Sequence, residues 1–96
     1  MSGMSGRGMS VIRGADAWGP FAPNLDAAEL RARLRALRQT TRLLIGPRGA
    51  DLCRLLAQAE TDPEALEPAC RAVDALAAND RRQILASYAA LNRPAA

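Results

Sequence analysis

Arginine is the residue type in this 96-residue sequence whose number and spacing point most clearly to chemistry. Four of these residues, Arg31, Arg35, Arg38 and Arg42, follow one another at steps of four, three and four positions. In a helix this spacing places them in one stripe, because side chains three and four residues apart share a face. Such an arginine stripe could bind an acidic protein or nucleic-acid phosphates, or it could be a solvated face whose stems cover the core edge.

Aromatic residues are few, and two of the three lie in a segment rich in glycine and proline. Trp18 and Phe21 stand in the run Ala-Trp-Gly-Pro-Phe-Ala-Pro, whereas Tyr88 falls in a helical pattern. Leaving large aromatic side chains in water forfeits favourable burial. This segment therefore either folds back to complete a small core or anchors another protein through Trp18 and Phe21.

The absence of certain residue types excludes much catalytic chemistry. The 13 basic residues are all arginine, and there is no histidine, so no histidine base, Schiff-base lysine or P-loop lysine exists. Cys53 and Cys70 cannot complete a zinc site without histidine. The acidic residues between positions 60 and 67 are explained by helix starts. We therefore expect a protein that is not an enzyme and that binds no cofactor and no metal.

The two cysteines lie equally far on either side of a turn near residues 61–62. In an antiparallel hairpin they would sit at similar heights, which permits a disulfide if their side chains point toward each other. We expect instead that Cys53 and Cys70 are reduced packing residues, since the sequence is typical of a cytoplasmic protein. It has no apolar run long enough to span a membrane, and its polar beginning lacks the apolar core of a secretory signal. Abundant alanine together with arginine in place of lysine indicates a bacterial source.

Apolar periodicity predicts an all-α fold, a small bundle of about four helices. The clearest helix covers residues 25–45, where Asp26 and Glu29 have capping-box spacing and Asn24 is a rival cap. Gly46 and Pro47 are typical of its end. Its apolar seam consists of Leu30, Leu34, Leu37, Thr41 and Leu44.

Three shorter helices are predicted over residues 50–60, from about residue 67, and over residues 81–92. Asp62 and Pro63 indicate a restart, and Pro68 favours a separate turn over residues 63–66 before the third helix. Asp80 and Gln83 have capping-box spacing for the fourth helix, whose apolar stripe is Ile84, Tyr88 and Leu91. Short connections make consecutive helices antiparallel neighbours.

We expect a flexible arm over residues 1–23, the helical domain over residues 24–92 and a tail over residues 93–96. The glycine-rich arm cannot bury enough apolar surface to offset its ordering entropy. The first helix is longer than its neighbours, so its seam is either covered inside the monomer or shared with a second copy in a homodimer.

These observations favour a non-catalytic protein-binding module, such as an adaptor, a chaperone or a regulatory subunit. Trp18, Phe21 and the arginine stripe are the residues expected to contact the partner, and the positive charge (net +3) favours a partner with an acidic surface. The alternative is a small nucleic-acid-binding protein that uses the arginine stripe, whose binding would weaken steeply with salt.

Overall fold

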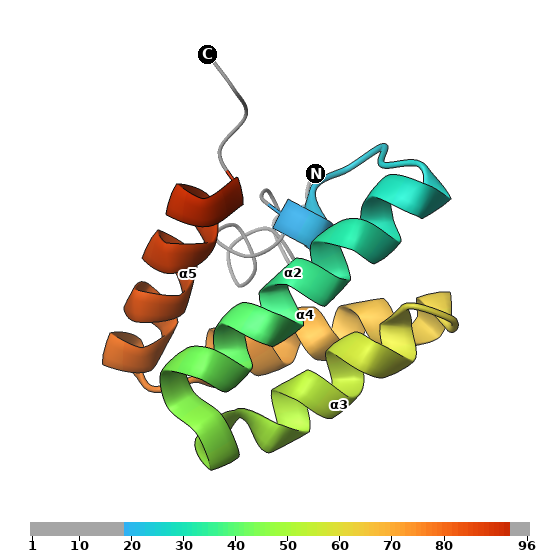
Figure 1. Ribbon diagram of the computed structural model, residues 1–96. Coiled ribbons are helices and arrows are strands. Elements are labelled where there is room, and N and C mark those ends of the chain that lie inside the picture. The colour runs from blue at the N-terminus through green and yellow to red at the C-terminus, as the bar shows by residue number, and fades with distance from the viewer. Residues whose placement is uncertain (1–18, 93–96) are drawn as a thin grey trace, which may run out of the picture.

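The computed structural model describes residues 19–92, in which the regular secondary structure is helical and no strand occurs. The four α-helices are α2 (Ala27–Ile45), α3 (Ala50–Ala59), α4 (Leu66–Ala75) and α5 (Ala78–Asn92), as Figure 1 shows. Three short 3-10 helices accompany them, namely η1 (Gly19–Phe21), η2 (Gly46–Gly49) and η3 (Pro63–Ala65). The prediction of an all-α bundle of about four helices is confirmed. Trp18, most of the predicted arm and the tail lie outside the described residues.

The start and the end of α2 lie close to the predicted positions. The Asp26 carboxylate accepts a hydrogen bond of 2.8 Å from the backbone N–H of Glu29, so Asp26 is the cap. Asn24 does not cap this helix and instead adopts a positive φ of 64°. At the other end the N–H of Gly46 bonds to the carbonyl of Arg42 as the helix stops. Local capping chemistry therefore sets the length of the helix that carries the arginine stripe.

The turn between α3 and α4 also follows the prediction. The Asp62 carboxylate accepts from the N–H of Glu64 at 3.0 Å, with Pro63 as the first residue of η3. A separate turn thus precedes α4, as Pro68 indicated. Pro68 itself occupies the first turn of α4, where the backbone N–H groups have no partner within the helix, so its missing N–H costs little there.

The predicted start of the last helix is wrong by three residues. α5 begins at Ala78, so Asp80 lies inside the first turn and does not cap it. The Asp80 carboxylate instead accepts two hydrogen bonds from the guanidinium of Arg48, at 2.8 and 3.2 Å. A contact between residues 32 positions apart has replaced a local one, which capping-box spacing cannot anticipate.

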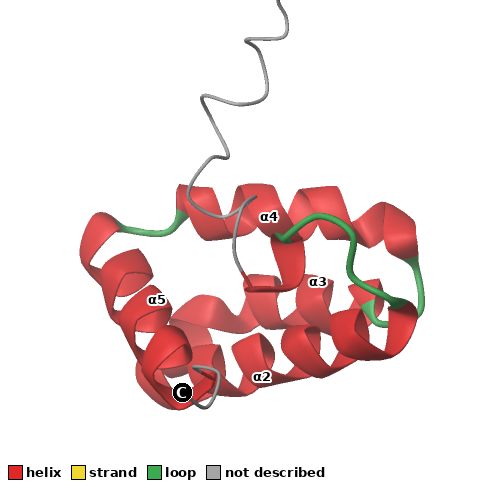
Figure 2. Cartoon of the chain, turned by 90° about the horizontal axis from the view of Figure 1, so that it is seen from above, coloured by secondary structure: helices red, strands yellow, loops and turns green. Residues whose placement is uncertain are grey.

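α2 packs against two of the other three α-helices, α3 and α5, and α4 lies on the far side of α3 (Figures 1 and 2). The expectation that consecutive helices are neighbours holds for the first two connections and fails for the third, because α5 contacts α2 far more extensively than it contacts α4.

The middle of the predicted seam on α2 is fully buried inside one chain. Leu34, Leu37 and Thr41 have no exposed surface, so this part of the seam is covered inside the monomer, as the first of the two alternatives expected. Leu44, predicted to continue the seam, is 37% exposed, and Ile45 is buried in its place. Leu91 of the α5 stripe is 73% exposed. Periodicity locates a stripe, but it does not say how far the neighbouring elements extend along it.

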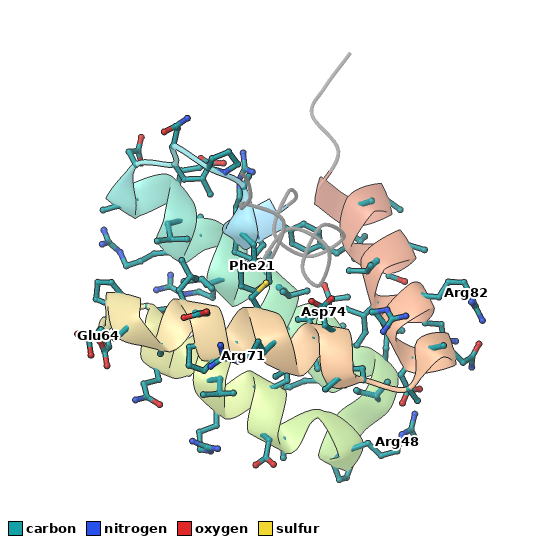
Figure 3. All side chains as sticks on the ribbon, turned by 180° about the vertical axis from the view of Figure 1, so that it is seen from behind. Phe21, Arg48, Glu64, Arg71, Asp74 and Arg82 are labelled. Carbon is teal, nitrogen blue, oxygen red and sulfur yellow. The ribbon has the colours of Figure 1, made fainter. Side chains whose placement is uncertain are left out.

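η1 shows that the end of the predicted arm is part of the core. Phe21 is only 6% exposed and belongs to the core cluster, and Figure 3 shows it lying among the helices. Arg33 donates to the Gly19 carbonyl at 3.1 Å and so ties η1 to α2. Gly19 has a φ of 51° and lies so close to Tyr88 that a Cβ would meet its ring at 3.1 Å. The fold-back alternative is therefore correct for Phe21, and its assignment as an exposed partner anchor is wrong.

Candidate protein-binding groove

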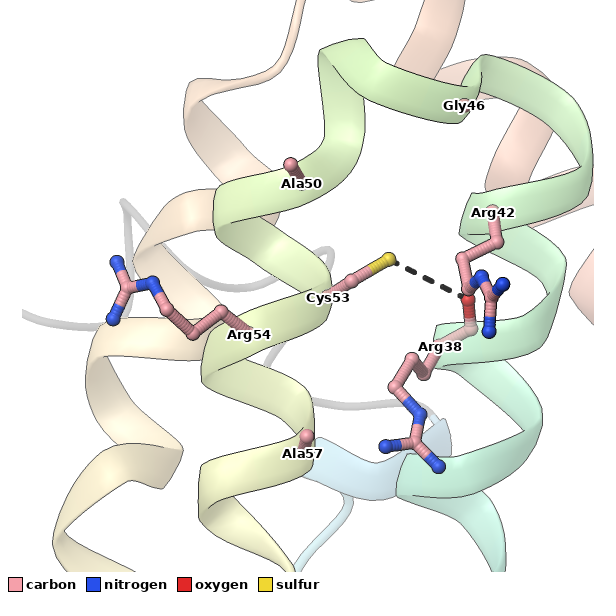
Figure 4. A pocket seen from close by; sticks show the side chains of 7 residues that line it. All are labelled: Arg38, Arg42, Gly46, Ala50, Cys53, Arg54 and Ala57. Carbon is pink, nitrogen blue, oxygen red and sulfur yellow. Dashed lines mark hydrogen bonds between the residues drawn. The ribbon is translucent and has the colours of Figure 1, made fainter.

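An open groove of about 590 Å³ runs between α2 and α3. Figure 4 shows the groove from close by. The three residues without a long side chain, Gly46, Ala50 and Ala57, leave this space between the two helices. The remaining lining residues are Arg38, Arg42, Cys53 and Arg54. The groove thus combines small, apolar walls with arginine side chains, and two members of the predicted stripe, Arg38 and Arg42, line it.

The arginine side chains in the groove differ in their direction. Arg38 and Arg42 extend from α2 beside the groove, whereas Arg54 extends away from α2 (Figure 4). Arg54 lies 3.6 Å from Asp51, in an exposed ion pair that contributes little to stability. The arginine side chains that face the groove from α2 are therefore those of Arg38 and Arg42.

Glu60 engages half of the arginine stripe. Its Oε1 accepts a hydrogen bond of 3.0 Å from Arg35, and its Oε2 lies 3.4 Å from the Arg38 guanidinium. Arg31 and Arg42 have no acidic partner within residues 19–92. The middle two arginines of the stripe thus share one carboxylate, which compensates one of their two positive charges, whereas Arg31 and Arg42 keep their full charge for a partner.

Cys53 lies half-buried in the wall of the groove. Its thiol is 3.6 Å from the Arg38 carbonyl oxygen, toward which it donates across to α2 (Figure 4). Burial raises the pKa of Cys53, and the positive charges of Arg42 and Arg38 oppose this rise only in part. The thiol is therefore protonated and weakly nucleophilic near neutral pH. Cys53 and Cys70 form no disulfide with each other, since Cys70 lies in the core while Cys53 is turned toward α2.

A second, smaller hollow adjoins the groove at Arg42. It is lined by Gln39, Arg42 and Leu43 and measures about 310 Å³. Leu43 is 81% exposed, which leaves an aliphatic side chain beside an arginine that no described acid neutralises. Leu43 was not among the site residues predicted from the sequence. Its position outside the apolar seam of a helix was the available signal, because an apolar residue on a polar face has no core to enter.

The residues predicted to contact a partner therefore separate into three groups. Arg38 and Arg42 lie in the groove, with Arg35 beside them at Glu60, and Arg31 is exposed one turn nearer the start of α2. Phe21 is in the core, and Trp18 lies outside the described residues.

Two further observations bear on what the chain could bind. Within residues 19–92 no group of three or more cysteine or acidic side chains is placed to hold a metal ion. None of the described helices is both long enough and apolar enough to cross a membrane.

No family model, curated protein or solved structure matches the chain.

Proposed function

We propose that this chain is a non-catalytic protein-binding module of the cytoplasm, acting as an adaptor, chaperone or regulatory subunit. Its docking surface is the α2/α3 groove together with the adjoining hollow, and its partner is an acidic segment of another protein. The observation that carries the proposal is Arg42, which borders both hollows, has no acidic partner in the described part of the chain and stands beside the exposed Leu43.

The chemistry of the groove argues for an acidic peptide. A carboxylate entering beside Arg42 would gain a charge-assisted hydrogen bond, and guanidinium groups bind carboxylates in a forked geometry. An aliphatic side chain next to that carboxylate could cover Leu43 and remove apolar surface from water. The complementary partner is therefore a segment in which acidic and aliphatic residues alternate closely.

The same geometry makes nucleic acid the weaker alternative. A phosphate backbone is bound by a dense row of cations, and each engaged cation adds to the salt dependence of binding. Glu60 already pairs with Arg35 and Arg38, the middle two members of the stripe, and its carboxylate compensates one of their two positive charges. The row that a nucleic acid would meet is accordingly interrupted at its centre.

A fluorescent peptide of Glu-Glu-Leu repeats tests the proposal by anisotropy. A length of about fifteen residues exceeds the span of α3 in either helical or extended form. We expect the Arg42→Gln variant to bind this peptide several-fold more weakly than the unaltered protein. The matched control is Arg82→Gln, which removes the same charge from an exposed position on α5 that also has no acidic partner among the described residues (Figure 3).

The outcomes separate the proposals clearly. Weaker binding by Arg42→Gln with no change for Arg82→Gln supports the groove. Equal weakening by both variants means that only net charge matters and refutes it, as does a peptide that does not bind. A single-stranded DNA of matched charge that binds more tightly than the peptide, with Arg42→Gln again the weaker variant, favours the nucleic-acid alternative.

A further inference from the structure

Glu60 is an acidic residue whose carboxylate contacts Arg38, one of the arginines that line the groove. It follows the last residue of α3, one turn beyond the groove-lining Ala57. Its side chain is only 11% exposed, yet it contacts two guanidinium groups from α2, those of Arg35 and Arg38. An internal carboxylate thus already holds Arg38, one of the two α2 arginines that line the groove.

We propose that Glu60 competes with the carboxylate of an acidic ligand for Arg38. Glu60 thereby lowers the affinity of the groove for acidic partners and restricts binding to those that can displace it from Arg38. This inference rests on the function proposed above, because it concerns the regulation of the same surface.

The two contacts of Glu60 differ in strength, so a ligand can displace one of them without the other. Arg35 makes a hydrogen bond of normal length to Oε1. Oε2 is buried and has no hydrogen-bond partner among the described residues, and Arg38 approaches it to 3.4 Å through charge attraction alone. Arg38 is therefore held less firmly than Arg35, and it is the arginine that a ligand carboxylate would capture first.

The burial of Glu60 explains why this exchange opposes binding. A nearly buried carboxylate is stable only while a cation accompanies it, since an unpaired charge away from water is costly. A ligand that takes Arg38 leaves Glu60 with Arg35 as its remaining cation among the described contacts. Part of the gain at the ligand is thus cancelled at Glu60, and replacing Glu60 by a neutral side chain of the same shape removes this cost.

The decisive variant is Glu60→Gln, measured with the Glu-Glu-Leu peptide by anisotropy. We expect it to bind the peptide about two- to fivefold more tightly than the unaltered protein, because binding then no longer breaks the partly exposed ion pair between Glu60 and Arg38. Glu67→Gln is the matched control, because it adds the same net charge by breaking the exposed pair between Glu67 and Arg71 on α4. Equal tightening in both variants, or weaker binding by Glu60→Gln, would overturn the proposal.

A second comparison leaves Glu60 in place and therefore does not require the Glu60→Gln variant to fold. Arg38→Gln should weaken peptide binding less than Arg42→Gln does, because Arg38 is already engaged and Arg42 is not. An equal or larger loss for Arg38→Gln contradicts the competitor role. If the unaltered protein does not bind the peptide at all, the proposed function fails. If it binds and Glu60→Gln behaves as Glu67→Gln does, only the role of Glu60 fails.

Discussion

Replacing Phe21 by alanine is the sharpest test of how this chain uses its N-terminal segment. Phe21 is 6% exposed within the core cluster, so truncation removes a buried ring and leaves a cavity. Changes of this kind cost about 3–5 kcal/mol. The described domain of residues 19–92 has an expected stability of roughly 4–11 kcal/mol from its size. Phe21→Ala should therefore remove a large part of the free energy of unfolding, and the melting temperature should fall by more than about 10 °C.

Urea unfolding followed by far-ultraviolet circular dichroism measures this loss directly. Leu91→Ala is the control, since it also truncates a large apolar side chain but at a position that is 73% exposed. We expect it to change the free energy of unfolding by less than about 0.5 kcal/mol. A Phe21→Ala protein whose unfolding midpoint equals that of the unaltered protein would refute the assignment of η1 to the core. The same result would restore Phe21 as an anchor for another protein.

Three further predictions follow from the region around α2. Gly49→Ala should lower the free energy of unfolding by about 1–3 kcal/mol, because the added Cβ would lie 2.6 Å from the Thr41 methyl carbon; an unchanged urea midpoint contradicts this. The rate of Cys53 alkylation by iodoacetamide should rise with pH around a midpoint above that of a free thiol, since burial raises the pKa of Cys53. Arg42→Gln should move this midpoint higher, because the positive charge of Arg42 lowers the pKa of Cys53. A midpoint at or below the free-thiol value would contradict the burial of Cys53. The same raised pKa means that stability falls as pH rises from the unfolded to the folded value, because the unfolded thiol ionises first. Leu43→Ala should leave the unfolding midpoint unchanged, because Leu43 is 81% exposed. It should weaken binding of the Glu-Glu-Leu peptide but not of a Glu-Glu-Ala peptide. Equal effects on both peptides would exclude the hollow as a site for an aliphatic side chain.

The two arginines that α2 contributes to the groove were predictable from the sequence because they lie along one helix. The spacing of the stripe places Arg38 and Arg42 on a common face of α2, and both residues line the groove. The capping interaction of Asp26 fixes where that helix starts, and Gly46 marks where it ends. Each of these features depends on residues within one or two turns of each other, where the geometry of the helix determines which side chains meet.

The failures share a different property, which is that they concern contacts between distant residues. Asp80 pairs with Arg48 instead of capping α5, and Phe21 enters the core instead of remaining in an arm. Leu44 is partly exposed, although it continues the seam, because burial depends on where the neighbouring elements stop. Periodicity within a single helix contains no information about these neighbours.

The sequence by itself determined the helices of this protein, the turn before α4 and the face of α2 on which the arginines lie, because caps, prolines and a period of 3.6 residues act locally. Only the tertiary structure decided which arginines of the stripe pair with an acidic side chain and which do not. Glu60 lies 25 residues beyond Arg35 in the chain, and the packing of α3 against α2 is what brings their side chains together. The same packing, with small residues on α3 and at the end of α2, opened the groove beside Arg42.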